Sequence, residues 1–210
     1  MAEVKQNGIV VTPSSGSGDT VLSVKAETPN RGNRVKQSAT FEVEASGVSE
    51  KKTFIANHVA AAEFVSFDNT SPAVAKEGGA VTITGKSNSS KLIFTKGSGE
   101  IIQADIANIQ YTANGSEATN NVDIDGDPGA KAAFAFSLTL TASSYDTVES
   151  RTQQIIARTT GGQSATCTLN QTAGDPTLEI TPESIDVPQD GSAVEVNVTT
   201  NTTFTVTSKA

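Results

Sequence analysis

The amino-acid sequence predicts an all-β protein made of tandem immunoglobulin-like β-sandwich domains. Two observations support this fold class. Short runs rich in Val, Thr and Ile alternate between apolar and polar residues, which is the period of a half-buried strand. Turn residues interrupt these runs about every eight to twelve residues, as they do in β-sandwiches. No segment sustains a helical period, and we expect at most one short helical turn, within Ile101–Ile109.

The last stretch of the chain, residues 176–210, shows the strand pattern most clearly. It begins with a short strand, Leu178–Ile180, and a turn follows at Asp190-Gly191. An alternating run comes next, with the apolar members Val194, Val196, Val198, Phe204 and Val206. About three strands fit here, whereas an immunoglobulin-like sandwich needs about seven. We therefore expect the first half of a domain, completed either by a continuation of the natural chain or by a neighbouring subunit.

An internal repeat links this stretch to earlier parts of the chain. Gly78 can be aligned with Gly191, and Asn57 with Asn170. The members of both pairs lie 113 positions apart in the sequence. Further pairs at the same spacing are Val81 with Val194, Ile83 with Val196, Asn88 with Asn201 and Ser89 with Thr202. A fixed period of this kind indicates repeated structural units.

The repeat divides the chain into three units. Residues 1–62 are expected to form a small immunoglobulin-like β domain, residues 63–175 a larger β-sandwich, and residues 176–210 the incomplete third domain. The strands expected in the first unit are Gly8–Val11, Val21–Val24, Phe41–Val43 and Thr53–Ala56.

The middle unit contains the most regular strand and the strongest turn signals. A hairpin is expected at Asn114-Gly115, a second turn at Asn120–Gly129 and a closing hairpin at Gly161-Gly162. We expect one core, formed by Val81, Ile83, Phe134, Phe136, Leu138, Leu140, Cys167 and Leu169.

Composition argues against several partners and locations. The formal net charge is −8 and the isoelectric point about 4.7, whereas nucleic acids and anionic membranes select basic surfaces. No apolar run approaches the roughly 20 residues of a membrane span. The start, Met1–Val11, lacks the pattern of a signal peptide, so we expect a protein that is made in the cytoplasm and not exported by the general secretory route.

No arrangement of residues points to an enzyme or to a cofactor. The segment Ala80–Ser87 fits a loose phosphate-loop pattern, but its middle residues are strand formers and no helix follows. His58 is the only histidine, so we expect neither a His-based metal cluster nor a Ser-His-Asp relay, and we expect His58 to be a polar residue at the end of a strand. We expect Cys167 to be a buried, inert thiol within a strand. Glu42 and Glu44 are expected to be solvated.

Asp123, Asp125 and Asp127 form the one candidate metal site, because carboxylates at alternate positions suit Ca²⁺. The standard twelve-residue calcium loop requires Gly at its sixth position and a carboxylate at its twelfth, and these positions hold Pro128 and Phe134. The competing interpretation is an Asp-Gly hairpin turn.

The C-terminal pattern resembles a known family. The stretch Leu178–Ile185, followed by Gly191, the alternating valines, Asn201 and Phe204, resembles the opening half of a BACON-type (Bacteroidetes-associated) immunoglobulin-like domain. The segment Leu169–Ala173 looks like the closing strand of such a domain, which tends to end near a Gln. The family usually has Trp where Phe204 stands.

The resemblance implies two competing functions. In the first, the chain is a structural virion protein, a capsid-decoration or head-fibre component on the particle surface of a phage of gut Bacteroidetes, with capsid or fibre subunits as partners. In the alternative, it is a carbohydrate-binding or adhesion module of an exported bacterial surface protein. Glycans stack on exposed aromatic rings, and Phe204, next to Asn201, is the candidate for such a contact.

Overall fold

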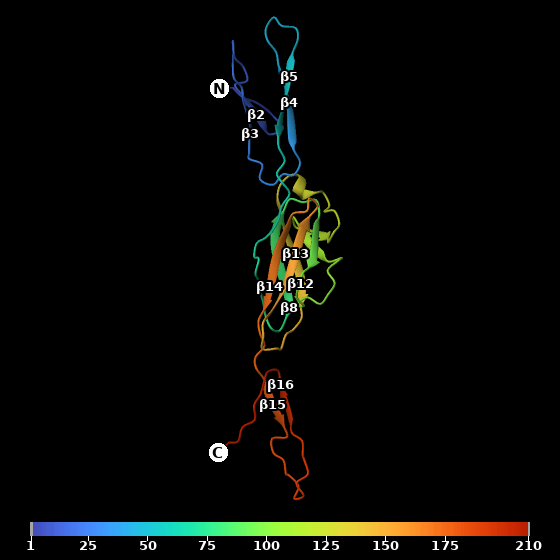
Figure 1. Cartoon of the computed structure of the whole chain (residues 1–210). Coiled ribbons are helices and arrows are strands. Elements are labelled where there is room, and N and C mark those ends of the chain that lie inside the picture. Colours follow the sequence, from blue (N-terminus) through green and yellow to red (C-terminus); the bar gives the residue numbers. More distant parts are fainter. Residues whose placement is uncertain (1, 210) are drawn as a thin grey trace.

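The computed structural model describes residues 2–209 and shows an elongated molecule. Three β units lie end to end, with the largest in the middle and the two termini at opposite ends (Figure 1). Within residues 2–209, strands dominate and the only helical element is a single 3-10 turn, η1 (Pro128–Ala130). The predicted all-β fold of tandem immunoglobulin-like units is confirmed.

The N-terminal unit consists of a three-stranded sheet and a two-stranded hairpin. The sheet has the order β1-β2-β3, and the hairpin pairs β4 with β5. The bounds are β1 (Val4–Gln6), β2 (Ile9–Thr12), β3 (Ser23–Ala26), β4 (Gln37–Val43) and β5 (Lys52–His58). Inward-facing side chains of β2 and β4 form a small core, in which the rings of Phe41 and Phe54 stack at 5.4 Å.

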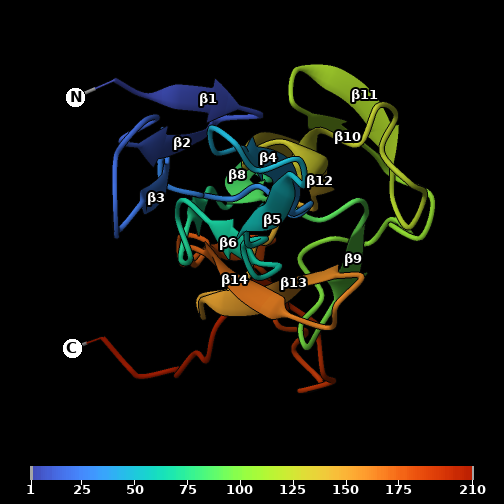
Figure 2. The ribbon, with the colours of Figure 1, turned by 90° about the horizontal axis from the view of Figure 1, so that it is seen from above.

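The middle domain is a sandwich of two sheets with the orders β11-β10-β12-β8-β6 and β7-β14-β13-β9. Viewed along the long axis, β8 and β12 lie on one side and β13 and β14 on the other (Figure 2). The bounds are β6 (Val65–Phe67), β7 (Ala73–Val74), β8 (Gly79–Ser87), β9 (Leu92–Lys96), β10 (Gln110–Ala113), β11 (Ser116–Thr119), β12 (Phe134–Ala142), β13 (Arg151–Thr159) and β14 (Ser164–Gln171).

The core between these sheets confirms the predicted strand register. Every second residue of β12 is buried from Phe134 to Ala142, and Leu138 at its centre is 0% exposed. Of the eight predicted core residues, seven are buried, and Val81 is partly buried against the same cluster. Alternation therefore assigned each strand face correctly, since a shift of one residue would have exposed the whole set.

Two hairpins form as predicted. Asn114 and Gly115 both have positive φ, 51° and 81°, and connect β10 to β11 in a two-residue turn. Glycine suits this left-handed backbone because it has no side chain to clash, and asparagine tolerates it. The turn at Gly161-Gly162 connects β13 to β14.

Two expectations in the middle domain need correction. The predicted turn within Asn120–Gly129 forms, but the interpretation of its Asp-Gly step as a hairpin turn is wrong, because this segment connects β11 to β12, which lie on opposite sides of β10. The one helical turn of residues 2–209 is η1, so the stretch Ile101–Ile109 has none. Its main chain is instead held by side chains, since the amide of Ile102 donates to Gln153 Oε1 at 2.5 Å.

The C-terminal unit is an isolated hairpin. β15 (Leu178–Thr181) pairs antiparallel with β16 (Asn197–Thr200), and no other strand within the described residues pairs with either of them.

Candidate functional site

The most distinctive local structure is a hydrogen-bonded asparagine at the start of the middle domain. Asn88 is fully buried, its Oδ1 accepts from the amide of Phe64 at 2.9 Å, and its Nδ2 donates to the carbonyl of Ala62 at 2.9 Å. The neighbouring hydroxyl of Ser87 donates to the carbonyl of Phe64 at 2.7 Å. These bonds tie the end of β8 to the segment that enters the domain.

The same arrangement recurs in the C-terminal hairpin. Asn201 Oδ1 accepts from the amide of Thr177 at 2.9 Å, and its Nδ2 donates to the carbonyl of Asp175 at 2.9 Å. The hydroxyl of Thr200 donates to the carbonyl of Thr177 at 2.6 Å. Each of these residues lies 113 positions after its counterpart, so the sequence repeat is also a repeat of contacts.

Strand register and turn geometry follow the same spacing. In the middle domain Val65 is paired with Ser87, and in the hairpin Leu178 is paired with Thr200. The turns at Gly78 and Gly191 have φ of 74° and 75°, and both are closed by a bond from the glycine amide to the carbonyl three residues earlier. β15 and β16 therefore correspond to β6 and β8, the first strand and the third strand of a sandwich.

The junctions between units are repeated as well. At the first, the amide of Ala61 donates to the carbonyl of Asn33 at 2.7 Å, and at the second the amide of Gly174 donates to the carbonyl of Thr147 at 2.6 Å. In both cases the donor lies in the linker that leaves a unit. The acceptor lies in a loop of that unit, the β3–β4 loop or the β12–β13 loop. At both junctions the linker is thus hydrogen-bonded to a loop of the unit that it leaves.

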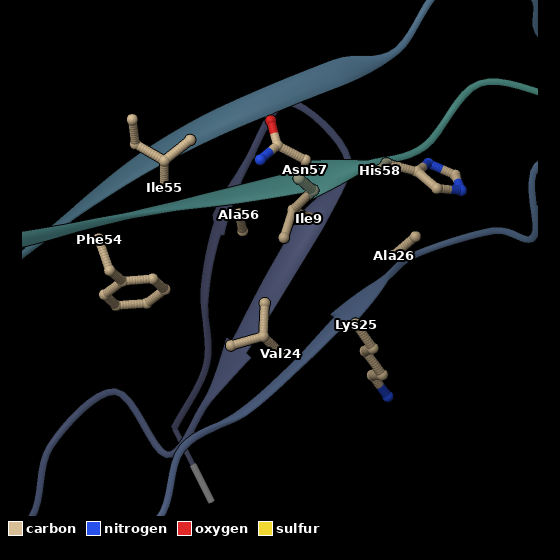
Figure 3. Close-up of a pocket in the computed structure, with 9 residues that line it drawn as sticks. All are labelled: Ile9, Val24, Lys25, Ala26, Phe54, Ile55, Ala56, Asn57 and His58. Atoms are coloured by element: carbon tan, nitrogen blue, oxygen red, sulfur yellow. The ribbon is translucent and has the colours of Figure 1, made fainter.

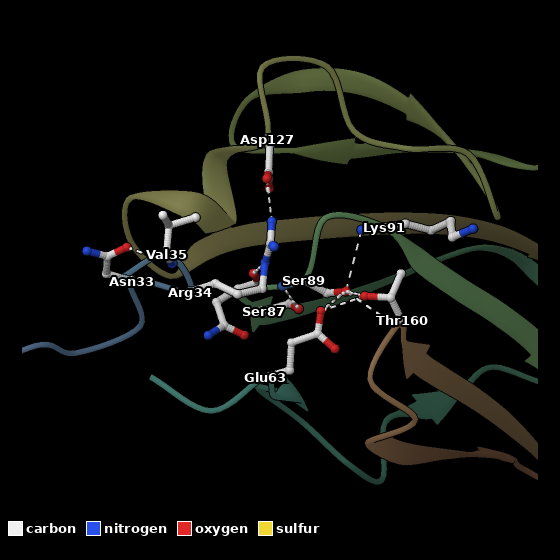
Figure 4. A network of polar contacts seen from close by, with 10 residues as sticks. Asn33, Arg34, Val35, Glu63, Ser87, Ser89, Lys91, Asp127 and Thr160 are labelled. Carbon is white, nitrogen blue, oxygen red and sulfur yellow. Dashed lines mark hydrogen bonds and ion pairs between the residues drawn. The ribbon is translucent and has the colours of Figure 1, made fainter. Parts of the chain in front are cut away.

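Arg34 reinforces the first junction. Its Nε donates to the carbonyl of Asn88 at 3.0 Å, and its guanidinium pairs with Asp127 at the start of η1 (Figure 4). Main-chain bonds from Arg34 and Val35 to Gly129 and Ala130 accompany it. Sequence reasoning missed Arg34, because nothing in its local pattern shows that it reaches across a domain boundary.

A second polar network closes the same end of the middle domain. Glu63 accepts hydrogen bonds from the hydroxyls of Thr160 and Ser89, at 2.6 Å and 3.0 Å (Figure 4). It also accepts one from the amide of Gly161. Burial alone would raise the pKa of Glu63, but the hydrogen bonds from Thr160, Gly161 and Ser89 outweigh it and hold the pKa below its usual value. The carboxylate fastens the linker to the β13–β14 turn.

The three candidate calcium ligands do not converge. Asp123 and Asp125 are exposed, while Asp127 pairs with Arg34. Among residues 2–209, no group of three or more His, Cys, Asp or Glu side chains is arranged to hold a metal ion. The role of Asp127 in this structure is to connect two domains.

The phosphate-loop pattern, the cysteine and the histidine lie in regular strands. The phosphate-loop pattern Ala80–Ser87 falls within β8, which confirms its interpretation as a strand. Cys167 is fully buried in β14, and burial raises the pKa of its thiol to about 11. His58 is the last residue of β5. In the described part of the chain, no helix is long and apolar enough to cross a membrane.

The C-terminal hairpin presents an uncovered apolar face. Val196 is 40% exposed and Phe204 is 54% exposed, so no other described part of the chain covers either of them. In the middle domain the counterpart of Val196, Ile83, is 2% exposed. The amide of Asn201, proposed as a glycan contact, is already engaged with main-chain atoms of the linker and, at 2.5 Å, with the carbonyl of Asp146.

A second uncovered apolar surface lies at the other end of the molecule. A groove opens between β3 and β5, and side chains of both strands and of Ile9 point into it (Figure 3). Its apolar lining consists of Ile9, Val24, Ala26, Phe54, Ile55 and Ala56, and Lys25, Asn57 and His58 also line it. We call this surface the N-terminal groove. Sequence reasoning missed this groove, because local strand patterns do not show which strands become neighbours.

Comparison with known proteins finds solved structures that are similar to the chain at low sequence identity. No protein-family model and no curated protein sequence matches the chain. A protein from Bacteroides thetaiotaomicron with an NMR structure is 13% identical, with a TM-score of 0.29, over 54% of this chain and 91% of that one. The EC1-3 structure of mouse clustered PcdhgC3 is 13% identical, with a TM-score of 0.38, over 70% of this chain and 46% of that one.

Proposed function

We propose that the chain is a structural virion protein, a capsid-decoration or head-fibre component that displays immunoglobulin-like domains on a bacteriophage particle. The observation that supports it is the end-to-end arrangement of the three β units in an elongated rod (Figure 1), in which each linker is hydrogen-bonded to a loop of the unit that it leaves. Such a rod holds a domain away from its point of attachment. The resemblance of the C-terminal pattern to BACON-type domains favours a phage of Bacteroidetes.

The ends of the rod are its contact surfaces in this proposal. Exposed apolar side chains with unpaired strand edges are suited to strand addition by another subunit, which couples folding to assembly. Capsid or fibre subunits are the expected partners. The acidic composition and the net charge of −8 keep the displayed domains soluble and do not favour nucleic acid.

The proposal is tested on purified phage particles from a strain that encodes the chain. We expect mass spectrometry to find the protein in the particles at a fixed ratio to the major capsid protein, and immunogold labelling against the middle domain to mark their surface. Recovery of the protein only from bacterial envelopes, with particles free of it, would contradict the proposal.

Carbohydrate binding is the second candidate function, favoured by the exposed ring of Phe204. An exposed aromatic ring offers a flat apolar face on which a sugar can stack. A glycan array probed with the full chain tests this, with Phe204→Ala as the variant and Val122→Ala, an exposed position of the middle domain, as the control. Binding lost only in Phe204→Ala would favour the adhesion function over the virion one.

A further inference from the structure

We propose that the N-terminal groove binds an extended, acidic segment of another protein, which adds as a strand to the free edge of β5 and inserts an apolar side chain into the groove. The inference deepens the proposed function, because it names the place and the chemistry of one contact with a partner subunit. It rests on that function only for the partner being a capsid or fibre subunit.

The first step is the correspondence between the β4–β5 hairpin and the β13–β14 hairpin. The residues of β5 lie 113 positions before those of β14, as Asn57 lies before Asn170. Both hairpins are antiparallel. The last residue of β5, His58, is paired with the first residue of β4, and its counterpart Gln171 is paired with the first residue of β13. The outer edge of β5 therefore corresponds to the outer edge of β14.

The second step is what covers the outer edge of β14. There β7 runs parallel to β14, with Val74 paired with Gln171. The amides of Thr168, Asn170 and Thr172 donate to main-chain carbonyls of the segment that contains β7, at 2.8 Å, 3.0 Å and 3.1 Å. The side chain of Val74 is buried in the core. A strand added to this edge thus supplies both main-chain hydrogen bonds and an apolar side chain.

The third step is that the same edge of β5 is free. Within residues 2–209, β5 is hydrogen-bonded to β4 only. Residues 13–22 connect β2 to β3, as the segment with β7 connects β6 to β8, but no main-chain hydrogen bond joins them to β5. The amide of Ser14 donates instead to the main chain just before β1, at 2.9 Å. The three donors of β14 correspond to Ile55, Asn57 and Val59, whose amides are therefore available to a strand from another chain.

His58 occupies the place of a side chain that holds β7. In the middle domain, Gln171 Nε2 donates to the carbonyl of Ala75, immediately after β7, at 3.0 Å. His58 is the counterpart of Gln171 and lines the N-terminal groove. A ring N–H of histidine can donate to a main-chain carbonyl in the same way. A docked strand would thus gain a side-chain hydrogen bond next to its main-chain bonds.

The groove is the apolar part of this site. It lies between the free edge of β5 and β3, so a strand added to β5 would run along it (Figure 3). An apolar side chain in the place of Val74 would enter the groove near Ile9 and Phe54. It would also cover Val24, which is 44% exposed in the single chain. Burial of these apolar surfaces favours binding of a segment that alternates apolar and polar residues.

The charge around the groove selects an acidic segment. Lys25 lines the groove, and a second pocket, which adjoins it at the end of β5, is lined by Arg31 and Lys131. The one carboxylate of that pocket, Glu27, is paired with Lys5 at 2.9 Å. This edge is thus positively charged, although the whole chain has a net charge of −8. Acidic residues in the bound segment would be attracted here, whereas a second copy that used the same edge would be repelled.

The experiment measures the binding of short fluorescent peptides to the full chain by fluorescence anisotropy. In the probe peptides an apolar residue (Val, Ile, Leu or Ala) alternates with Thr, and glutamates flank the alternating part. One control set carries lysines in place of the glutamates. A second control set keeps the acidic composition but groups the apolar residues together. We expect acidic alternating peptides to bind, and both control sets to bind roughly tenfold more weakly or not at all.

Variants of the full chain locate the site. Val24→Asp places a carboxylate in the groove and should weaken binding of the acidic peptides roughly tenfold, because docking would bury that charge unpaired. Lys25→Glu reverses a charge at the groove and should weaken binding about threefold. Both positions are exposed, so the core is unchanged. Val122→Asp and Lys86→Glu, at exposed positions of the middle domain, are the matched controls. Circular dichroism verifies that all variants fold.

Amide hydrogen exchange measured by NMR gives a second readout, which is specific for strand addition. Binding of an acidic peptide should slow the exchange of the amides of Ile55, Asn57 and Val59, because they become hydrogen-bonded to the added strand. Exchange in the middle domain should not change. A peptide that bound only through side chains would leave these three amides as they are in the free chain.

The proposal is overturned if no alternating peptide binds, if basic and acidic peptides bind equally well, or if binding leaves the exchange of those three amides unchanged. It is also overturned if sedimentation velocity shows that the chain alone self-associates and Val24→Asp abolishes this, because the occupant would then be a second copy. None of these results depends on whether the protein is recovered from phage particles, so failure of this proposal is distinguishable from failure of the proposed function.

Discussion

Asn88 and Asn201 make the same two main-chain hydrogen bonds, each with the amide 24 positions before it and the carbonyl 26 positions before it. One lies at the entry of a complete domain and the other at the entry of a hairpin. This relationship identifies the hairpin as the counterpart of β6 and β8. Its exposed apolar face therefore corresponds to the face that β6 and β8 bury in the middle domain.

Asn88→Ala should destabilise the middle domain by about 2–4 kcal/mol, because it leaves the amide of Phe64 and the carbonyl of Ala62 without partners in a buried setting. Urea unfolding measures the loss. Asn201→Ala is the matched comparison and should cost less, since its partners are exposed to water. Equal losses at the two sites would show that burial is not the cause.

Leu138→Ala should cost about 2–5 kcal/mol, because the side chain is fully buried at the centre of β12 and its removal leaves a cavity. Chemical unfolding of the purified chain tests this. Leu178→Ala is the control: Leu178 is 63% exposed, so its loss should change stability by no more than about 0.5 kcal/mol. A small effect at Leu138 would contradict the packing described here.

Glu63 should make stability depend on pH in the acidic range. Its folded-state pKa lies below the usual value of 4.5, so its contribution is fully present at neutral pH and disappears as the pH falls through the folded-state value. Unfolding curves measured between about pH 6 and pH 3 should fall more steeply for the natural chain than for Glu63→Gln. Parallel curves would show that the hydrogen bonds to the carboxylate carry no such coupling.

Arg34→Ala should loosen the first junction without unfolding either domain, because it removes the ion pair with Asp127 and the bond to the carbonyl of Asn88. Small-angle X-ray scattering should show a broader distribution of maximum dimensions. Lys52→Ala, which removes an exposed pair with Glu50, is the control and should leave the scattering unchanged. Unchanged scattering for Arg34→Ala would mean that main-chain bonds suffice.

The regular strands of the middle domain could be predicted from the sequence, because alternation decides which side chains face a core whatever lies opposite. Phe134, Phe136 and Leu138 are buried as this rule requires. The interpretation of Asp125-Gly126 as a hairpin turn is wrong for the opposite reason, because the flanking strands β11 and β12 are not neighbours. A turn motif reports a local reversal of the backbone, but which strands become neighbours depends on the whole sheet.

The sequence alone shows the spacing of 113 residues between repeated positions, the all-β class and the strand pattern of residues 176–210. Only the tertiary structure decided what surrounds these segments. In the folded chain Asp127 pairs with Arg34 and does not converge with Asp123 and Asp125. Asn201 is hydrogen-bonded to the main chain of the linker, and a groove lies beside β3. The physical reason is that periodicity and turn chemistry act over a few neighbouring residues, whereas partners across a domain boundary are chosen by the packing of the complete chain.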